Sequence, residues 1–383
     1  MNLEEFRACL ALKHTRGIGP KTWREIVSSY GTAAGAVADV QMWHMRGVAG
    51  KGQVKRFLSG KWEAAAEREL QQCREKGMRV ICLSDSRFPE ALRNIPDPPL
   101  YLYAHGDLSL LMNPGVAVVG ARRCTRYSTE VARLLGRELA RAGITVVSGL
   151  ADGIDRYAHL GGIEEPGRSV AVLGTGLDLI YPARNRDLWE RMSEFGLVLT
   201  EFPPGTQPDG PNFPHRNRII SGLSLGVVVV QAAIRSGTLI TARLAMEQGR
   251  EVFVVPGPVD GPGFEGSHQL VRDGATLVRG VEDILVELAP LLQKRYPALC
   301  GTKTVQAENK PARDKPAGLT LTDEEYRVFT HLVSAGKQQM ESLGIAMDWD
   351  SPRLSQVLLM LELKGAVRQL PGMIYEVEAG CRI

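Results

Sequence analysis

The stretch "GVAVVGARRCTRY", residues 115–127, decides the fold. It is a run of small and β-branched apolar residues that ends at Gly120, and a segment with helical periodicity, residues 128–143, comes after it. A buried strand that ends in a glycine turn and enters a helix is the repeating unit of a parallel α/β sheet, and such a turn commonly holds a phosphate. Arg122 and Arg123 stand where a dinucleotide site would have further glycines, so the sequence predicts a phosphate contact of another kind.

Five more apolar runs, most of them rich in valine, come after the first one. They occupy residues 144–149, 169–174, 197–201, 226–232 and 251–257. Continuous apolar runs are typical of strands buried on both faces, and the helix-like segments between most of them supply the crossovers that parallel pairing needs. We therefore predict an α/β fold with a doubly wound, extended Rossmann-like parallel sheet, in which ligands bind beyond the carboxyl ends of the strands.

Composition and hydrophobic periodicity change along the sequence. Its 383 residues are a length typical of two or three domains. Residues 296–319 are rich in Pro, Lys, Ala and Gly and lack hydrophobic periodicity, as a flexible linker would. We predict a helical domain of SAM or helix-hairpin-helix type at residues 1–75, a Rossmann-like domain at 76–295, this linker, and a winged-helix-like domain at 320–383.

Composition and motifs argue against several classes of protein. The 46 basic and 43 acidic side chains nearly cancel, so any site for a polyanion must be a local patch. The six cysteines form no CxxC pair, and the sequence has neither an HExxH nor a GxSxG motif. It also has no signal peptide and no apolar run of about 18 residues. We expect a cytoplasmic protein with no membrane span, no cofactor, no metal and no catalytic residues.

The spacing of polar residues after the first two strands argues against a dinucleotide site. The turn at Gly120 lacks the second and third glycines of the fingerprint, and the next run ends in Ser148-Gly149 without an acid for a ribose hydroxyl.

Asp155 and His159 lie four residues apart on one helix face. This pair could hold a metal, but a structural hydrogen bond is the more frequent role for such a pair.

The string "NFPHRNRIISGLS", residues 212–224, places an aromatic residue beside two arginines. Phe213 precedes Arg216 and Arg218, with Asn217 between the arginines. Single-stranded nucleic acid favours this combination, because a base stacks on the ring while guanidinium groups hold phosphates. The alternative is that Phe213 belongs to the core and that the arginines form salt bridges.

The string "AIRSGTLITA", residues 233–242, is a third basic junction between a strand and a helix. Its residues Arg235, Ser236, Gly237 and Thr238 suit a nest of donors for an anion, or alternatively ordinary capping of the helix. Three basic, glycine-containing junctions at one edge of one sheet favour a shared polyanion site.

Several strings together resemble one known family over about residues 76–280. They are "VVGARRCTRYS", "SGLADGIDRYAH", "LGTGLDLIYPARN", "EFPPGTQP", "FPHRNRIISGLS", "SGTLITARLAMEQGREVFVVPG" and "HQLVRDGA". In order and content they resemble the DNA-processing protein A family, also called DprA or Smf. The resemblance implies a non-enzymatic, homodimeric protein that binds single-stranded DNA, protects incoming DNA during natural transformation, and helps to load the RecA recombinase onto it.

The resemblance also implies a set of DNA-binding residues. They are Gly120, Arg122, Ser148, Gly149, Phe213, Arg216, Asn217, Arg218, Arg235, Ser236, Gly237 and Thr238. The chain departs from the family at three positions: Arg235 stands where many relatives have lysine, His268 where asparagine is usual, and Asp152 where basic or neutral residues are common. An acid at position 152 weakens that edge of a phosphate track.

Two alternative functions come from neighbouring families and from the flanking segments. Nucleoside-monophosphate phosphoribohydrolases share this type of sheet, but Thr241 stands where their catalytic glutamate would be. The C-terminal segment resembles a winged helix, with two short strands around Pro371-Gly372, which allows a duplex-binding regulator. Its second long helix has Arg353 and Lys364 as its only bases, so we favour a protein contact there.

Two further patterns concern packing. Leu354, Val357, Leu358 and Leu361 have helical spacing and are predicted to be core residues. At the other end of the chain, Gly17-Ile18-Gly19 precedes a helix, as in a helix-hairpin-helix turn that meets a phosphate, or in a helical module that only packs.

Overall fold

The computed structural model describes residues 2–297, 321–364, 366–370 and 373–377. The chain divides into two compact units, Met1–Lys303 and Thr304–Ile383. Residues 298–319 of the predicted linker, and the predicted turn at Pro371-Gly372, lie outside the described residues. The division of the first unit into a helical and a Rossmann-like domain remains a proposal.

The first unit is built on a nine-stranded sheet with the order β1-β2-β6-β5-β4-β3-β7-β8-β9. The strands are β1 Arg79–Cys82, β2 Tyr101–Gly106, β3 Gly115–Val119, β4 Thr145–Ser148, β5 Ser169–Val172, β6 Leu197–Thr200, β7 Gly226–Val229, β8 Glu251–Val254 and β9 Thr276–Leu277. All six predicted strands are present, and from β6 to β9 the neighbours pair in parallel. The antiparallel pair β1 and β2 extends the sheet beyond β6, which the sequence pattern did not predict.

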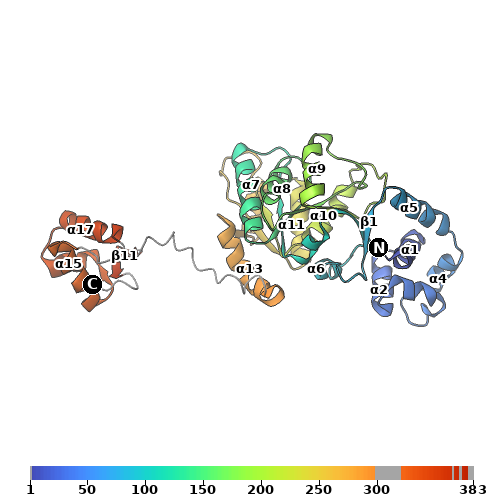
Figure 1. Ribbon diagram of the computed structural model, residues 1–383, viewed down its shortest axis with the longest axis horizontal. Coiled ribbons are helices and arrows are strands. Elements are labelled where there is room, and N and C mark those ends of the chain that lie inside the picture. The colour runs from blue at the N-terminus through green and yellow to red at the C-terminus, as the bar shows by residue number, and fades with distance from the viewer. Residues whose placement is uncertain (1, 298–320, 365, 371–372, 378–383) are drawn as a thin grey trace. The chain divides into compact units, whose positions relative to one another are not determined.

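Alternate residues of β3 belong to two separate cores, as a sheet covered on both faces requires. Val116 and Val118 pack in one core with residues of the helices α7, α8 and α13, whereas Ala117 and Val119 pack in the other with α10 and α11. These helices are α7 Arg126–Arg141, α8 Ile154–Gly162, α10 Asn212–Gly222, α11 Gly237–Glu247 and α13 Val281–Arg295; α6 Glu90–Arg93, α9 Arg186–Phe195 and α12 Glu265–Arg272 complete the set. Figure 1 labels all of these helices except α12. The doubly wound prediction is confirmed.

The direction of winding reverses at β3. The chain passes from β3 through β4 and β5 to β6 on one side, and then returns to place β7 on the other side of β3. In open α/β sheets ligands bind beside such a switch point, at the carboxyl ends of the strands. The loop at Gly120 and the turn at Arg235 follow the two strands that flank this point, β3 and β7.

Helices α7 and α8 approach each other closely because glycines line their contact. A Cβ atom on Gly136 would lie 2.3 Å from the Ala158 oxygen, and one on Gly161 would lie 2.1 Å from the Arg133 oxygen. No other residue fits at these two positions without moving a helix backbone. The contact fixes the loop before α8, which carries Asp152, relative to the start of α7.

Five helices of residues 1–75 pack at the β1 edge of the sheet, where Figure 1 shows them in blue. They are α1 Leu3–His14, α2 Pro20–Tyr30, α3 Ala33–Ala38, α4 Lys51–Leu58 and α5 Glu63–Glu75. Glu69 of α5 is 4% exposed and accepts hydrogen bonds from the hydroxyls of Tyr101 and Tyr103 on β2. Lys13 and His14 of α1 lie 3.4 and 2.8 Å from its two oxygens. This cluster ties the helices to the sheet.

The Glu69 cluster predicts an acid-sensitive contribution to stability. Burial alone would raise the pKa of Glu69, but the hydrogen bond from His14 and the charge of Lys13, together with both tyrosine hydroxyls, lower it to about 2. Because the folded pKa is depressed, the stabilisation is complete above the ordinary pKa and is lost as the pH falls toward about 2. We expect the free energy of unfolding to fall by about 2 kcal/mol more in the wild type than in Glu69→Gln between about pH 6 and pH 3. Urea titrations at both pH values measure this difference, and parallel pH dependences would contradict it.

The described residues of the second unit form three helices and a three-stranded sheet. They are α15 Asp323–Ala335, α16 Met340–Met347 and α17 Ser351–Leu363, with β10 Gln338–Gln339, β11 Val367–Leu370 and β12 Ile374–Val377. Thr322 caps α15 in a capping box with Glu325. The four leucine and valine positions predicted to be core are buried together on α17.

No helix in the described parts of the chain is both long enough and apolar enough to span a membrane.

Candidate nucleic-acid interface

The structure brings four of the predicted site residues into one pocket at the carboxyl edge of the sheet. Arg122 follows β3, Gly149 follows β4, and Phe213 and Arg216 lie in the first turns of α10. Gly174, which follows β5, forms part of the wall. Residues from four separate segments thus meet at the carboxyl edge of the sheet, on the β4 and β5 side of the switch point.

Phe213 and Arg122 form the exposed part of this pocket. The guanidinium carbon of Arg122 lies 5.3 Å from the centroid of the Phe213 ring, which is a cation–π arrangement. Arg122 is exposed, whereas Phe213 is half-buried. A Cβ atom on Gly174 would lie 2.8 Å from the Phe213 ring, so the glycine makes room for that ring. The predicted pairing of an aromatic ring with a cation is therefore present, formed across two loops.

Arg216 lies beneath the pocket and is buried, with 4% of its surface exposed. Its Nη1 atom donates to the carbonyl oxygen of Gly149 at 2.7 Å and to that of Val172. Burial lowers the pKa of Arg216 to about 10, so the side chain keeps its charge at neutral pH. A Cβ atom on Gly149 would lie 2.5 Å from the guanidinium, which explains the glycine there. Arg216 thus holds the ends of β4 and β5 and adds positive charge below the pocket.

Asp155 and His159 hold the loop that follows β4. The Asp155 carboxylate accepts from the Gly149 amide at 3.1 Å, and His159 Nε2 accepts from the Leu150 amide at 3.2 Å. Leu150 has a φ of 54°, a left-handed conformation that is rare for leucine and that these bonds support. Burial, together with the charge of Arg216, lowers the pKa of His159 to about 3, so the ring is neutral.

The structural interpretation of the Asp155–His159 pair therefore fits the geometry. Among the described residues there is no group of three or more His, Cys, Asp or Glu side chains that could hold a metal ion.

Three other predicted residues form hydrogen bonds or ion pairs with other residues of the protein. The Ser148 hydroxyl is buried and donates to the Val118 oxygen at 2.7 Å. Arg218 is buried and pairs with Asp97 at 2.9 Å and with Glu201, as the salt-bridge alternative described. The Asn217 side chain accepts a hydrogen bond from Nε of Arg216. The geometry favours supporting roles for these side chains.

The turn at Arg235 adjoins the loop at Arg122. The Gln231 oxygen, just after β7, accepts from the Ala121 amide at 2.8 Å, and the Gln231 side chain accepts from the Thr125 amide at 3.0 Å. Arg235 is exposed, while Thr238 is buried. Ser236 is the N-cap of α11, yet its buried hydroxyl makes no hydrogen bond within the described residues.

The Ser236 side chain therefore does not cap α11. This turn is not part of the wall of the Arg122 pocket, so it forms a neighbouring position along the same edge.

Tyr181 also lies in the pocket, although no motif in the sequence singled it out. Its ring centroid lies 5.6 Å from that of Phe213. Tyr181 belongs to the string "LGTGLDLIYPARN", which follows β5 and therefore had to reach the same edge. Tyr181 could have been predicted as a pocket residue, because the string that contains it follows a strand whose carboxyl end lies at this edge of the sheet.

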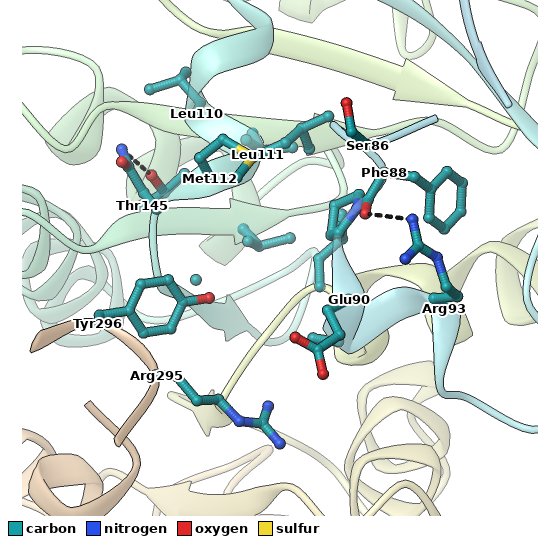
Figure 2. A pocket seen from close by; sticks show the side chains of 17 residues that line it. Ser86, Phe88, Glu90, Arg93, Leu110, Leu111, Met112, Thr145, Arg295 and Tyr296 are labelled. Carbon is teal, nitrogen blue, oxygen red and sulfur yellow. Dashed lines mark hydrogen bonds between the residues drawn. The ribbon is translucent and has the colours of Figure 1, made fainter. Parts of the chain in front are cut away.

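A larger pocket opens at the opposite, amino edge of the sheet. Gly115 and Thr145 at the starts of β3 and β4 line it, and Figure 2 shows Tyr296 and Glu90 on either side of it. The lining is mixed, with apolar walls, one acid and two arginines. None of the predicted DNA-binding residues lines this pocket.

The doubly wound sheet, with exposed arginines and an aromatic ring at its carboxyl edge, defines a protein of the Rossmann-like class. The model of the family DNA recombination-mediator protein A matches residues 79–289, and that of the DprA winged helix domain matches residues 310–373. The chain belongs to the DNA recombination-mediator protein A family and has its DNA-processing, recombination-mediator function. The phosphoribohydrolase and duplex-regulator alternatives are not favoured.

Individual relatives agree with this assignment. Protein Smf of Synechocystis sp. is 33% identical over 96% of this chain and 97% of its own length. The X-ray structure of DNA processing protein A from Streptococcus pneumoniae is 35% identical, covers 72% of this chain and 95% of its own, and has a TM-score of 0.62. The structure of DNA processing protein A from Helicobacter pylori is 31% identical, covers 56% and 96% of the two chains, and has a TM-score of 0.51.

Proposed function

We propose that the carboxyl edge of the sheet binds single-stranded DNA. The observation that carries the proposal is the exposed Arg122 guanidinium above the Phe213 ring in one pocket. An aromatic face and a nearby cation are what a single strand needs, because its bases are unpaired and its phosphates are regularly spaced. The structure of the Helicobacter pylori relative concerns its single-stranded DNA binding mode, which supports the same role here.

We assign some of the predicted residues to direct contacts with DNA and the others to holding the loops that make these contacts. Arg122 and Arg235, both exposed, hold phosphates, and the backbone at Ser236 and Gly237 adds donors at the start of α11. Phe213 stacks against a base. The remaining predicted residues shape these loops from below: Gly120, Ser148, Gly149, Arg216, Asn217, Arg218 and Thr238. Their buried guanidinium groups add long-range attraction for the strand.

The finer biological role is also a proposal. The protein would be cytoplasmic, would have no catalytic activity, and would hand the bound strand to the RecA recombinase during natural transformation. Leu277 is 47% exposed on β9, an edge strand of the sheet, which supports a homodimer formed through this unit.

The double substitution Arg122→Ala and Arg235→Ala tests the contact assignment. We expect the affinity for single-stranded DNA to fall about tenfold at low salt, and the slope of log affinity against log salt to become shallower by roughly 1.4 because two phosphate contacts are lost. Fluorescence anisotropy across a salt series measures both quantities.

A matched control removes two arginines elsewhere. Arg191 and Arg279 are surface residues of the same unit that pair with Glu164 and Asp283. Replacing both with alanine changes the net charge equally and should leave the affinity nearly unchanged. Equal losses in the two double variants would contradict the assignment, because the effect would then be one of overall charge.

A further inference from the structure

Tyr181 and Asp152 line the pocket of Arg122 and Phe213 but have no part in the proposed contacts. We propose that these two side chains form a nucleobase subsite that prefers guanine in single-stranded DNA. The inference rests on the proposed function, because it places one base of the bound strand beside Phe213. It adds a preference for one base to a site otherwise built from contacts that any sequence satisfies.

Tyr181 offers the more accessible aromatic face of the pocket. Its side chain is 39% exposed, and its ring is tilted by 38° to that of Phe213 at a centroid distance of 5.6 Å. A base occupies about 3.4 Å along a stack, so one inserted between two rings would need them about 7 Å apart. A base therefore does not insert between the two rings, and Tyr181 serves a base next to the one that stacks on Phe213.

Asp152 provides an acceptor where a phosphate would be repelled. It lies in the loop between β4 and α8, and its side chain is 18% exposed. Arg184 donates to Oδ2 of Asp152 at 2.5 Å, and no hydrogen bond among the described residues engages Oδ1. A carboxylate at the wall of a DNA site suits the hydrogen-bond donors on the edge of a base and not the backbone of the strand.

Guanine is the base whose edge best matches a carboxylate. Its Watson–Crick edge presents the N1–H and N2–H donors side by side. One donates to Oδ1 of Asp152, and the other donates to the second lone pair of Oδ2, which already accepts from Arg184. Thymine presents one N–H between two carbonyl oxygens, which a carboxylate repels, and adenine and cytosine each present one amino group. In a duplex these donors are occupied by the partner base, so the subsite accepts only an unpaired base.

Binding of oligothymidines of one length, each with a single central substitution, tests the proposal with the full chain. By fluorescence anisotropy we expect the strand with one guanine to bind about tenfold more tightly than the strand with thymine alone. Hypoxanthine, which lacks the N2 amino group, should fall between them. This series varies only the DNA, so it does not depend on the stability of any variant.

Protein variants assign the effect to the two residues. Asp152→Asn should bring the three strands to within about twofold of one another while strengthening binding of the thymine strand, since a negative charge is lost. Asp187→Asn removes a similar charge that pairs with Arg156 outside the pocket, and it should keep the guanine preference. Tyr181→Ala should weaken all three strands, and Tyr181→Phe should restore them because it keeps the ring.

The outcomes separate this inference from the proposed function. Equal affinity of the wild type for the three strands, or a guanine preference that persists in Asp152→Asn, overturns the inference and leaves the proposed function standing. A wild-type protein that binds no single-stranded DNA of any composition overturns the proposed function itself.

Discussion

Phe213→Ala is expected to weaken the binding of single-stranded DNA about thirtyfold, which corresponds to about 2 kcal/mol for the loss of one base–aromatic stack. The ring is half-buried between Gly174 and the Arg122 guanidinium, so its removal takes away both the stacking face and the platform over which Arg122 lies. Fluorescence anisotropy at constant salt measures the loss. The salt dependence should stay close to that of the wild type, because no phosphate contact is removed.

Phe195 offers a matched control for this substitution. It is 42% exposed at the end of α9, next to the start of β6, and the Arg168 guanidinium lies 6.0 Å from its ring centroid. It therefore has the same type of cation–aromatic contact, but at the amino edge of the sheet. Phe195→Ala should leave the affinity unchanged, and an equal loss in both variants would refute a stacking role specific to Phe213.

Arg216→Met is expected to lower the free energy of unfolding by about 4 kcal/mol. The substitution keeps much of the side-chain volume, but it leaves the carbonyl oxygens of Gly149 and Val172 without their shared donor. It also removes the cation near the buried Asp155, whose pKa burial already raises. Urea-induced unfolding followed by circular dichroism measures the change.

Arg126→Met is the control for that measurement. Arg126 is 92% exposed in its side chain and pairs with Glu130 one turn along α7, and such surface pairs contribute little. Its replacement should change the free energy of unfolding by less than about 0.5 kcal/mol. If Arg216→Met were as mild as Arg126→Met, Arg216 would not be a brace, and a direct phosphate contact would become its better assignment.

The parallel part of the fold could be predicted because each strand is buried on both faces and therefore reads as a continuous apolar run. The runs "VAVVG" and "GVVVVQA" identify β3 and β7, and the helical segments between runs require parallel pairing. The strands β1 and β2 could not be identified in this way. They are short, they pair antiparallel at the edge of the sheet, and β2 meets β6 only after about ninety intervening residues, a pairing that local periodicity does not encode.

The candidate site was predictable at the level of loops, and less so at the level of side chains. Arg122 and Phe213 meet because both lie at carboxyl ends of parallel strands or just beyond them. Arg216 is buried because it shares the inner face of α10 with Ile219 and Ile220, a helical spacing that the sequence already contains. The partners of Arg218 lie far from it in sequence, at Asp97 and Glu201, and only the tertiary fold brings them together.

Cross-linking of bound DNA tests the central claim most directly. A single-stranded oligonucleotide that carries 5-bromouracil is irradiated in complex with the full chain, and the linked peptides are identified by mass spectrometry. We expect the linked peptides to contain Phe213 and the loop of Arg122, and competition with unlabelled single strands, but not with duplex, to abolish the links. Cross-links confined to the amino-edge pocket around Tyr296, or to the second unit, would contradict a DNA site at the carboxyl edge of the sheet.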